Sequence, residues 1–148
     1  MTVQPIMTDI LTLARHRARA TDKGMFLHQT AANEIHDRLE MVNKSFTKPL
    51  VVTGFPVFWA AQLPSAAITP AEEVISAAQT AHDLVIHAMS LHWANDPVGQ
   101  LIQCRRALRA DGLFLSVAFG GQTLHELRAF LGQAEAAMTG GMSPRIAP

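Results

Sequence analysis

Three short runs of apolar residues constrain the fold of this 148-residue chain more than any other feature. They cover residues 50–53, 84–89 and 113–119. Each run is continuous rather than alternating, which is the pattern of a strand that is buried on both faces. Helical segments lie between the runs, and strands that alternate with helices form right-handed crossovers. The sequence therefore predicts an α/β fold with a doubly wound, mostly parallel sheet and helices on both faces.

Two segments ahead of the first run have the periodicity of amphipathic helices. One covers residues 9–19 and the other covers residues 26–42. In the first segment, Arg15, Arg17 and Arg19 lie mostly off the apolar side. A solvated helix face explains these arginines better than phosphate binding, which is the alternative interpretation. We predict two N-terminal helices before any strand.

Capping signals predict three further helices. In Thr69-Pro70-Ala71-Glu72, a threonine precedes a proline in the first turn and a glutamate three residues on, which is a capping box. Asp96-Pro97 begins a second helix, which should end at Asp111-Gly112. Thr123 begins a third helix in another capping box, and Gly140-Gly141 ends it.

The composition excludes several classes of protein. The chain has 12 basic and 12 acidic residues, so it lacks the basic surface of a nucleic-acid-binding protein. Its single cysteine, Cys104, permits no internal disulfide, and no apolar run approaches the ~18 residues of a membrane span. The first residues lack the pattern of a secretory signal, so we expect a cytoplasmic protein. Charged residues make up only 16% of the chain, from which we infer an apolar interface.

Polar residues gather where the second apolar run ends. Ser90, His92 and Trp93 come first, and Asn95 and Asp96 follow them. Ligands of doubly wound sheets bind beyond the carboxyl ends of the strands, so these residues are candidates for a site. There Trp93 would stack on a flat or cationic ligand, and His92 would act as a base or hydrogen-bond donor. The alternative is that the histidine is a satisfied loop residue and that Asp96 caps the next helix.

The turn after the first run, residues 53–56, stands where a nucleotide-binding fold has a glycine-rich loop. It contains one glycine, and Pro56 has no N–H to offer a ligand. An ordinary turn and a degenerate cofactor loop are equally compatible with this segment. His82, His87 and His92 do not suit a metal site, because an odd spacing on a strand points side chains to opposite faces. We predict no bound metal.

Residues 82–96 and 108–115, HDLVIHAMSLHWAND and LRADGLFL, resemble the fourth-strand to fifth-strand region of class I S-adenosylmethionine-dependent methyltransferases. Within that superfamily they are similar to the type 11 methyltransferases. The branch that they resemble holds the malonyl-carrier-protein methyltransferase of biotin synthesis and the mitochondrial complex I assembly factor. Residues 120–128 and 26–39 resemble the same branch. The resemblance implies a Rossmann-like fold and S-adenosylmethionine as the cofactor.

The chain departs from this family in several places. Of the acidic, glycine-rich loop that members carry after the first strand, only Gly54 is present. The carboxylate that members use to hold the cofactor ribose has two candidates here, Glu72 and Glu73. Residues 55–82 leave room for one strand-helix-strand unit, so a strand and a helix are expected to be missing. The C-terminal antiparallel strand pair of the family is also expected to be absent.

These departures predict an abbreviated fold. We divide the chain into an N-terminal helical segment, residues 1–45, and an incomplete Rossmann-like, methyltransferase-type domain, residues 46–148. The two segments are expected to form one structural unit overall. A sheet that lacks strands has an exposed edge, and proteins normally pair or cover such edges. We therefore expect a homo-oligomer that forms through the sheet edge or an apolar face, with neither nucleic acid nor membrane as a partner.

The resemblance implies an enzyme that transfers a methyl group to an unidentified small-molecule or protein acceptor. The turn after the first run would face the amino-acid part of the cofactor, and the end of the second run would lie near the sulfonium. His92 is the candidate catalytic base. The predicted cofactor-binding residues are Thr53, Gly54, Phe55, Glu72, Ala88, Met89, Ser90 and Trp93.

Two other functions fit the same residues. A non-catalytic interaction or assembly module is favoured by the missing loop glycines, whereas the polar residues around His92 favour the enzyme. Hydroxylation, or another reaction on the same scaffold, is a third alternative. A fold by itself does not settle the chemistry.

Overall fold

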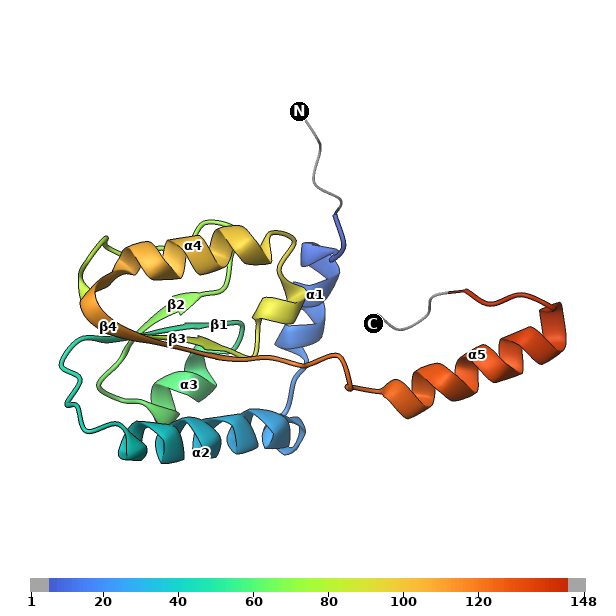
Figure 1. The fold of residues 1–148 in the computed structure, drawn as a ribbon, viewed down its shortest axis with the longest axis horizontal. Coiled ribbons are helices and arrows are strands. Elements are labelled where there is room, and N and C mark those ends of the chain that lie inside the picture. Colours follow the sequence, from blue (N-terminus) through green and yellow to red (C-terminus); the bar gives the residue numbers. More distant parts are fainter. Residues whose placement is uncertain (1–5, 144–148) are drawn as a thin grey trace. The chain divides into compact units, whose positions relative to one another are not determined.

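The computed structural model describes residues 6–143 of the chain. Contacts between residues divide it into two compact units, with the boundary between Ala118 and Phe119. The first unit contains the sheet and most of the helices, and the second contains one helix (Figure 1). None of the helices in the described residues is both long and apolar enough to cross a bilayer.

The first unit is built on a four-stranded parallel sheet. The strands lie in the order β2-β1-β3-β4, so that the first and third strands occupy the centre (Figure 1). This confirms the predicted α/β class and gives an abbreviated Rossmann-like fold. The strands are β1 (Pro49–Thr53), β2 (Ala67–Pro70), β3 (His82–Ala88) and β4 (Leu108–Val117).

Helices cover both faces of this sheet, as predicted (Figure 1). The helices α2 (Phe26–Met41) and α3 (Pro56–Gln62) lie on one face, and α4 (Pro97–Ala107) lies on the other. The first helix, α1 (Ile10–Ala18), begins at the capping residue Asp9. Two short 3₁₀ helices complete the unit, η1 (Asp22–Met25) and η2 (Leu91–Trp93). The two predicted N-terminal helices are therefore confirmed.

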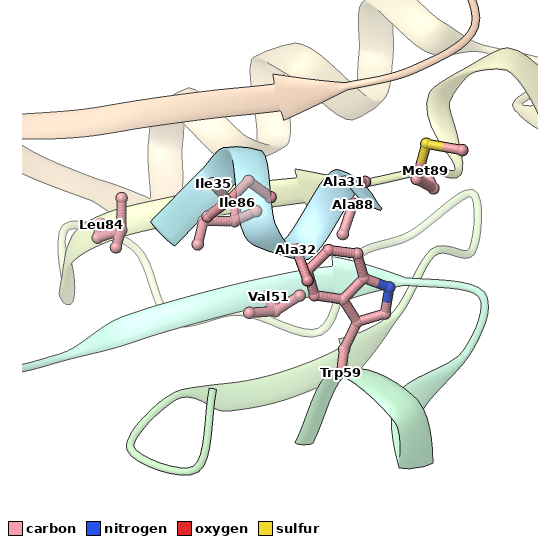
Figure 2. Packing of buried hydrophobic residues seen from close by; sticks show 9 residues of the cluster. All are labelled: Ala31, Ala32, Ile35, Val51, Trp59, Leu84, Ile86, Ala88 and Met89. Carbon is pink, nitrogen blue, oxygen red and sulfur yellow. The ribbon is translucent and has the colours of Figure 1, made fainter. Parts of the chain in front are cut away.

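The alternation of side chains along the central strands builds a core on each face of the sheet. On the α2 side, Figure 2 shows Ile35 and Ala32 next to Val51 and Ile86, with the indole of Trp59 closing the cluster. The next residues along the same strands point to the α4 side and form a second apolar cluster, which includes Leu50, Val52, Val85 and Cys104. Burial on both faces explains why the strands are continuous apolar runs.

The helix that we predicted from the capping box at Thr69 is wrong. Thr69 belongs to β2, where it pairs in parallel with Val52 of β1 and is buried. The pairing with β1 and the burial of the Thr69 side chain together outweigh a capping preference of about 1 kcal/mol. The connection that follows, residues 71–81, contains no helix or strand. Glu72 is therefore free of the capping role that the sequence suggested.

The helix that starts at Asp96-Pro97 is confirmed, because the Asp96 carboxylate accepts a hydrogen bond of 2.8 Å from the Gly99 N–H. Its predicted end at Asp111-Gly112 is wrong, since α4 stops at Ala107 and β4 begins at once. Leu108 is a buried strand residue that pairs with His82. The burial of Leu108 in the sheet core accounts for the early end of the helix.

In the second unit, α5 (His125–Thr139) is the one regular element of residues 119–143. The predicted capping box at Thr123 is wrong, because the helix starts two residues later with no side-chain cap. Leu124 takes the N-cap position with a φ of 58°. The predicted end is confirmed, since Gly140 adopts a φ of 70°, a left-handed conformation that glycine tolerates.

Candidate functional site

The carboxyl ends of β1, β2 and β3 surround a cavity of 560 Å³ in the first unit. This is the place where doubly wound sheets bind ligands. Five of the nine site residues that the sequence predicted line the cavity, and they come from all three strand ends. They are Thr53, Gly54, Glu72, Ser90 and Trp93.

Ser90 joins the ends of the two central strands. Its hydroxyl accepts a hydrogen bond of 2.8 Å from the Gly54 N–H and donates one of 3.1 Å to the Ala88 carbonyl. The hydroxyl of Thr53 accepts the N–H of Phe55 at 3.1 Å. These bonds fix the turn after β1 in a defined position, with Gly54 at the cavity wall.

The acidic part of the cavity lies beyond β2. Glu72 and Glu73 follow that strand by two and three residues, and both line the cavity. Their backbone carbonyls accept hydrogen bonds from two side chains of α4, Gln100 at 2.9 Å and Gln103 at 2.8 Å. Both glutamates are exposed, so their carboxylates are accessible from solvent.

Trp93 and His92 lie side by side in η2, with ring centroids 5.3 Å apart. Trp93 is 43% exposed and lines the cavity, whereas His92 does not. Burial, together with the charges of Arg17, His28 and His87, lowers the pKa of His92 to about 4. His92 is therefore neutral at pH 7.

Three of the predicted cofactor-binding residues do not line this cavity. Ala88 and Met89 are buried in the apolar cluster on the α2 side of the sheet. Phe55 instead borders a second cavity of 560 Å³. Its ring packs edge-on against the ring of His28, with the ring centroids 4.7 Å apart. Their predicted contacts with a ligand stay predictions.

His87 is a core residue. It is fully buried, and its Nε2 lies 2.8 Å from Oε1 of Gln100. Burial lowers its pKa, and the bond to Gln100 partly offsets that effect. The neutral ring is therefore the form that is buried in the core.

Two important residues of the cavity were given no catalytic or cofactor-binding role from the sequence. Arg17 of α1 borders it, and so does Asn95, whose side chain holds the chain just before α1. Asn95 Oδ1 accepts the N–H groups of Met7 at 2.9 Å and Thr8 at 2.8 Å. Nothing in the sequence distinguished Arg17 from the two neighbouring arginines, and Asn95 was visible only as part of a polar cluster.

No three histidine, cysteine, aspartate or glutamate side chains within residues 6–143 are placed to share a metal ion. The thiol of Cys104 is buried, and burial raises its pKa to about 11. It is thus protonated at neutral pH and packs as an apolar side chain.

Comparisons with known proteins identify relatives of the chain. It is 35% identical over 109 residues to the human protein named arginine-hydroxylase NDUFAF5, mitochondrial, and 36% identical over 113 residues to the rat protein of that name. It is also 39% identical over 66 residues to the putative methyltransferase RP459 of Rickettsia prowazekii. No family model and no solved structure matches the chain.

The matched regions are unequal parts of the proteins compared. The human match covers 74% of this chain but 32% of the human protein, and the Rickettsia match covers 45% of this chain and 29% of that protein. The chain thus spans about a third of the length of these relatives.

These relatives also correct the predicted location. The human, rat, mouse and zebrafish proteins are all named mitochondrial, which contradicts the cytoplasmic location that we expected. That expectation rested on the lack of a secretory-signal pattern and of a membrane-length apolar run, and neither bears on mitochondrial import.

The parallel sheet agrees with the resemblance of residues 82–96 and 108–115, which form β3, the polar segment after it, and the start of β4. The relatives include both a named hydroxylase and a named putative methyltransferase. Together, the fold and these identities show that the chain belongs to the methyltransferase-fold family.

Proposed function

We propose that this chain forms the cofactor-binding part of an S-adenosylmethionine-dependent methyltransferase-like protein. One observation carries the proposal: a carboxylate, a glycine turn and an indole from three separate strand ends border one cavity. The volume of 560 Å³ falls within the ~300–1,000 Å³ of small-molecule sites. The name of the Rickettsia relative supports the same proposal.

The residues of the cavity suit the parts of this cofactor. Glu72 would accept hydrogen bonds from a ribose diol, because an exposed carboxylate is a strong acceptor. The half-exposed indole of Trp93 would stack on adenine. Backbone at Thr53 and Gly54 would face the amino-acid end. The cofactor supplies an activated methyl group when it is bound, so the chain's own task is to hold the reactants in line.

His92 remains the proposed base for an acceptor that must lose a proton. Its pKa of about 4 leaves it unprotonated at pH 7, so it can accept a proton, although such a low pKa makes it a weak base. His92→Ala should lower turnover and leave cofactor affinity unchanged, since the side chain does not line the cavity. Unchanged turnover would remove His92 from this role.

A second function, a non-catalytic assembly module, is favoured by the turn after β1. That turn has one glycine, and Pro56 is the first residue of α3. The N–H groups that a glycine-rich loop would offer are accordingly few. Hydroxylation is another reaction that the same cavity would serve, because the human and rat relatives are named hydroxylases.

Calorimetric titration with S-adenosylmethionine and S-adenosylhomocysteine tests the proposed function. Saturable binding is expected, and Glu72→Gln should weaken it about 10-fold, through one lost charge-assisted hydrogen bond. Glu40→Gln, an exposed change on α2, serves as the control and should leave affinity unchanged. Gly54→Arg should abolish binding by filling the cavity wall.

The absence of saturable binding at millimolar ligand would contradict the enzyme and favour the assembly module. Binding that Glu72→Gln and Gly54→Arg leave unchanged would place the ligand elsewhere. Either result can be obtained with the chain alone, because the whole cavity lies in the first unit.

We also propose that the chain associates with itself. β2 is an outer strand of the sheet, and its free backbone groups are available to a partner. Light scattering over a range of concentrations should show a species larger than a monomer. A monomer at high concentration would contradict self-association.

A further inference from the structure

The guanidinium of Arg17 lies directly above Gly54. A Cβ atom placed on that glycine would be 2.2 Å from Cζ of Arg17 and 2.5 Å from both Nε and Nη2. Real atoms do not approach so closely, so a larger residue at position 54 would displace the flexible end of Arg17 from its place against the turn. Arg17 and Gly54 both border the cavity at the strand ends.

Arg17 has no anionic partner among residues 6–143. Its Cζ lies over the ring of Phe55, 5.9 Å from the ring centroid. The ion pairs that the described residues form involve other cations, at Arg38, Lys44 and Arg109. Burial lowers the pKa of Arg17, which reflects partial loss of water around its charge. A desolvated cation without a counter-ion is costly, and a bound anion would remove that cost.

The charges around the cavity are separated. The positive charge comes from Arg17 on α1. The two negative charges at the cavity wall come from Glu72 and Glu73, which follow β2. The arginine also lowers the pKa of its neighbours His28 and His92, which favours their neutral forms. Arg17 is therefore the fixed positive charge of this part of the cavity.

The position of Arg17 is supported by the attachment of α1. Asn95 makes three hydrogen bonds to the chain before this helix, including one of 3.1 Å from Nδ2 to the Thr8 carbonyl. Because Asn95 borders the same cavity, the helix is held at the cavity wall. An anion receptor on a tethered helix is already oriented before binding.

We infer that Arg17 receives the carboxylate of the ligand that binds beyond the strand ends. The inference rests on the proposed function and identifies that carboxylate as the one on the amino-acid end of S-adenosylmethionine. One guanidinium with no neighbouring lysine in the cavity wall suits a singly charged, planar anion. Gly54 lets the guanidinium lie against the turn, at the cavity wall where it would meet the carboxylate.

The test compares three ligands that differ at the amino-acid end. S-adenosylmethionine has the carboxylate, decarboxylated S-adenosylmethionine lacks only that group, and 5′-methylthioadenosine lacks the whole amino-acid end. Each is titrated into the unaltered chain and into Arg17→Met, Arg17→Lys and Arg15→Met. Arg15 lies on the same helix and is exposed, so its substitution changes net charge equally without altering the cavity.

The unaltered chain should bind S-adenosylmethionine roughly 10- to 100-fold more tightly than its decarboxylated form, as expected for a bidentate charged contact. Arg17→Met should remove this difference and leave the affinity for 5′-methylthioadenosine unchanged. Arg17→Lys should restore part of the difference, and Arg15→Met should retain all of it. Circular dichroism of each variant confirms that the fold is kept.

Tighter binding of S-adenosylmethionine by Arg17→Met would overturn the inference, because the arginine would then block the cavity. Equal weakening of all three ligands by Arg17→Met would also overturn it, since the role would be structural. No binding of any ligand by the unaltered chain would refute the proposed function as well, which distinguishes that failure from the other two.

Discussion

Nε2 of His87 lies 2.8 Å from Oε1 of Gln100, and both side chains are buried between β3 and α4. The amide nitrogen of the same glutamine donates to the Glu72 carbonyl at 2.9 Å. Gln100 thus joins a core histidine to the acidic wall of the cavity. One turn further along α4, Gln103 makes two similar bonds. Its Oε1 accepts the N–H of Ile75, and its Nε2 donates to the Glu73 carbonyl.

Gln100→Ala should reduce the free energy of unfolding by about 2–3 kcal/mol, because it leaves a buried imidazole nitrogen and a carbonyl without a partner. Gln103→Ala is the matched control. It removes two bonds nearer the surface and should cost about 1 kcal/mol. Urea unfolding measures both values. Equal losses would show that burial of the His87 pair contributes nothing extra.

Three histidines should make stability depend on pH. Burial lowers the pKa of His28, His87 and His92 below 6.5, to about 4 for His92. The unfolded chain therefore binds more protons than the folded chain below pH 6.5, so folding is favoured above that pH and weakened as pH falls toward 4.

The free energy of unfolding should consequently fall by about 2–3 kcal/mol as the pH is lowered from 7.5 to 4.5, and the thermal unfolding midpoint should fall with it. His92→Gln should reduce the dependence, whereas His125→Gln, an exposed change in the second unit, should not. A midpoint that stays constant over this range would contradict the lowered pKa values.

Asp83 should act in a lower pH range. Burial raises its pKa, but hydrogen bonds from the N–H groups of Thr47 at 2.7 Å and Lys48 at 2.9 Å, with one from the Thr47 hydroxyl, outweigh that effect and lower it to about 2. Its contribution is complete above pH ~4 and is lost as pH falls toward 2.

Asp83→Asn should therefore destabilise the chain at pH 7 by about 1–3 kcal/mol, since an amide cannot accept all of these bonds with both of its terminal atoms. Asp111→Asn is the control, because Asp111 is exposed and its ion pair with Lys44 lies at the surface. Chemical denaturation at pH 7 checks both variants, and an equal effect would refute the special role of Asp83.

Asn95→Ala should loosen α1 without unfolding the sheet. α1 has no buried residue, so it depends on its attachments more than on core packing. Loss of the three Asn95 bonds should raise amide hydrogen exchange in residues 7–18 by roughly 10-fold and leave exchange in β3 unchanged. Asn33→Ala, on the surface of α2, is the control. Unaltered exchange in α1 would mean that other contacts hold it.

The predicted sheet followed from local pattern because its strands bury both faces. Val51 and Val52 point to opposite sides of the sheet and are both fully buried, so apolar residues follow one another there instead of alternating with polar ones. The cap at Asp96 was similarly predictable, since the capping carboxylate and the N–H that donates to it lie within a single turn.

The site was predicted in part for the same reason. Gly54, Ser90 and Trp93 each follow a recognisable strand, and parallel strands bring their carboxyl ends to one edge. Glu72 was connected with the site only by resemblance, because the pattern around it predicted a helix where the structure has β2.

The amino-acid sequence by itself determined the apolar runs, the two N-terminal helices and the polar segment after β3, because each depends on neighbours along the chain. Only the tertiary structure decided that Thr69 lies in a strand and that Arg17, unlike Arg15, lies above Gly54. A capping preference contributes about 1 kcal/mol, whereas pairing with a strand and burial against it contribute several times that amount. Contacts between residues far apart in the chain therefore decided both outcomes.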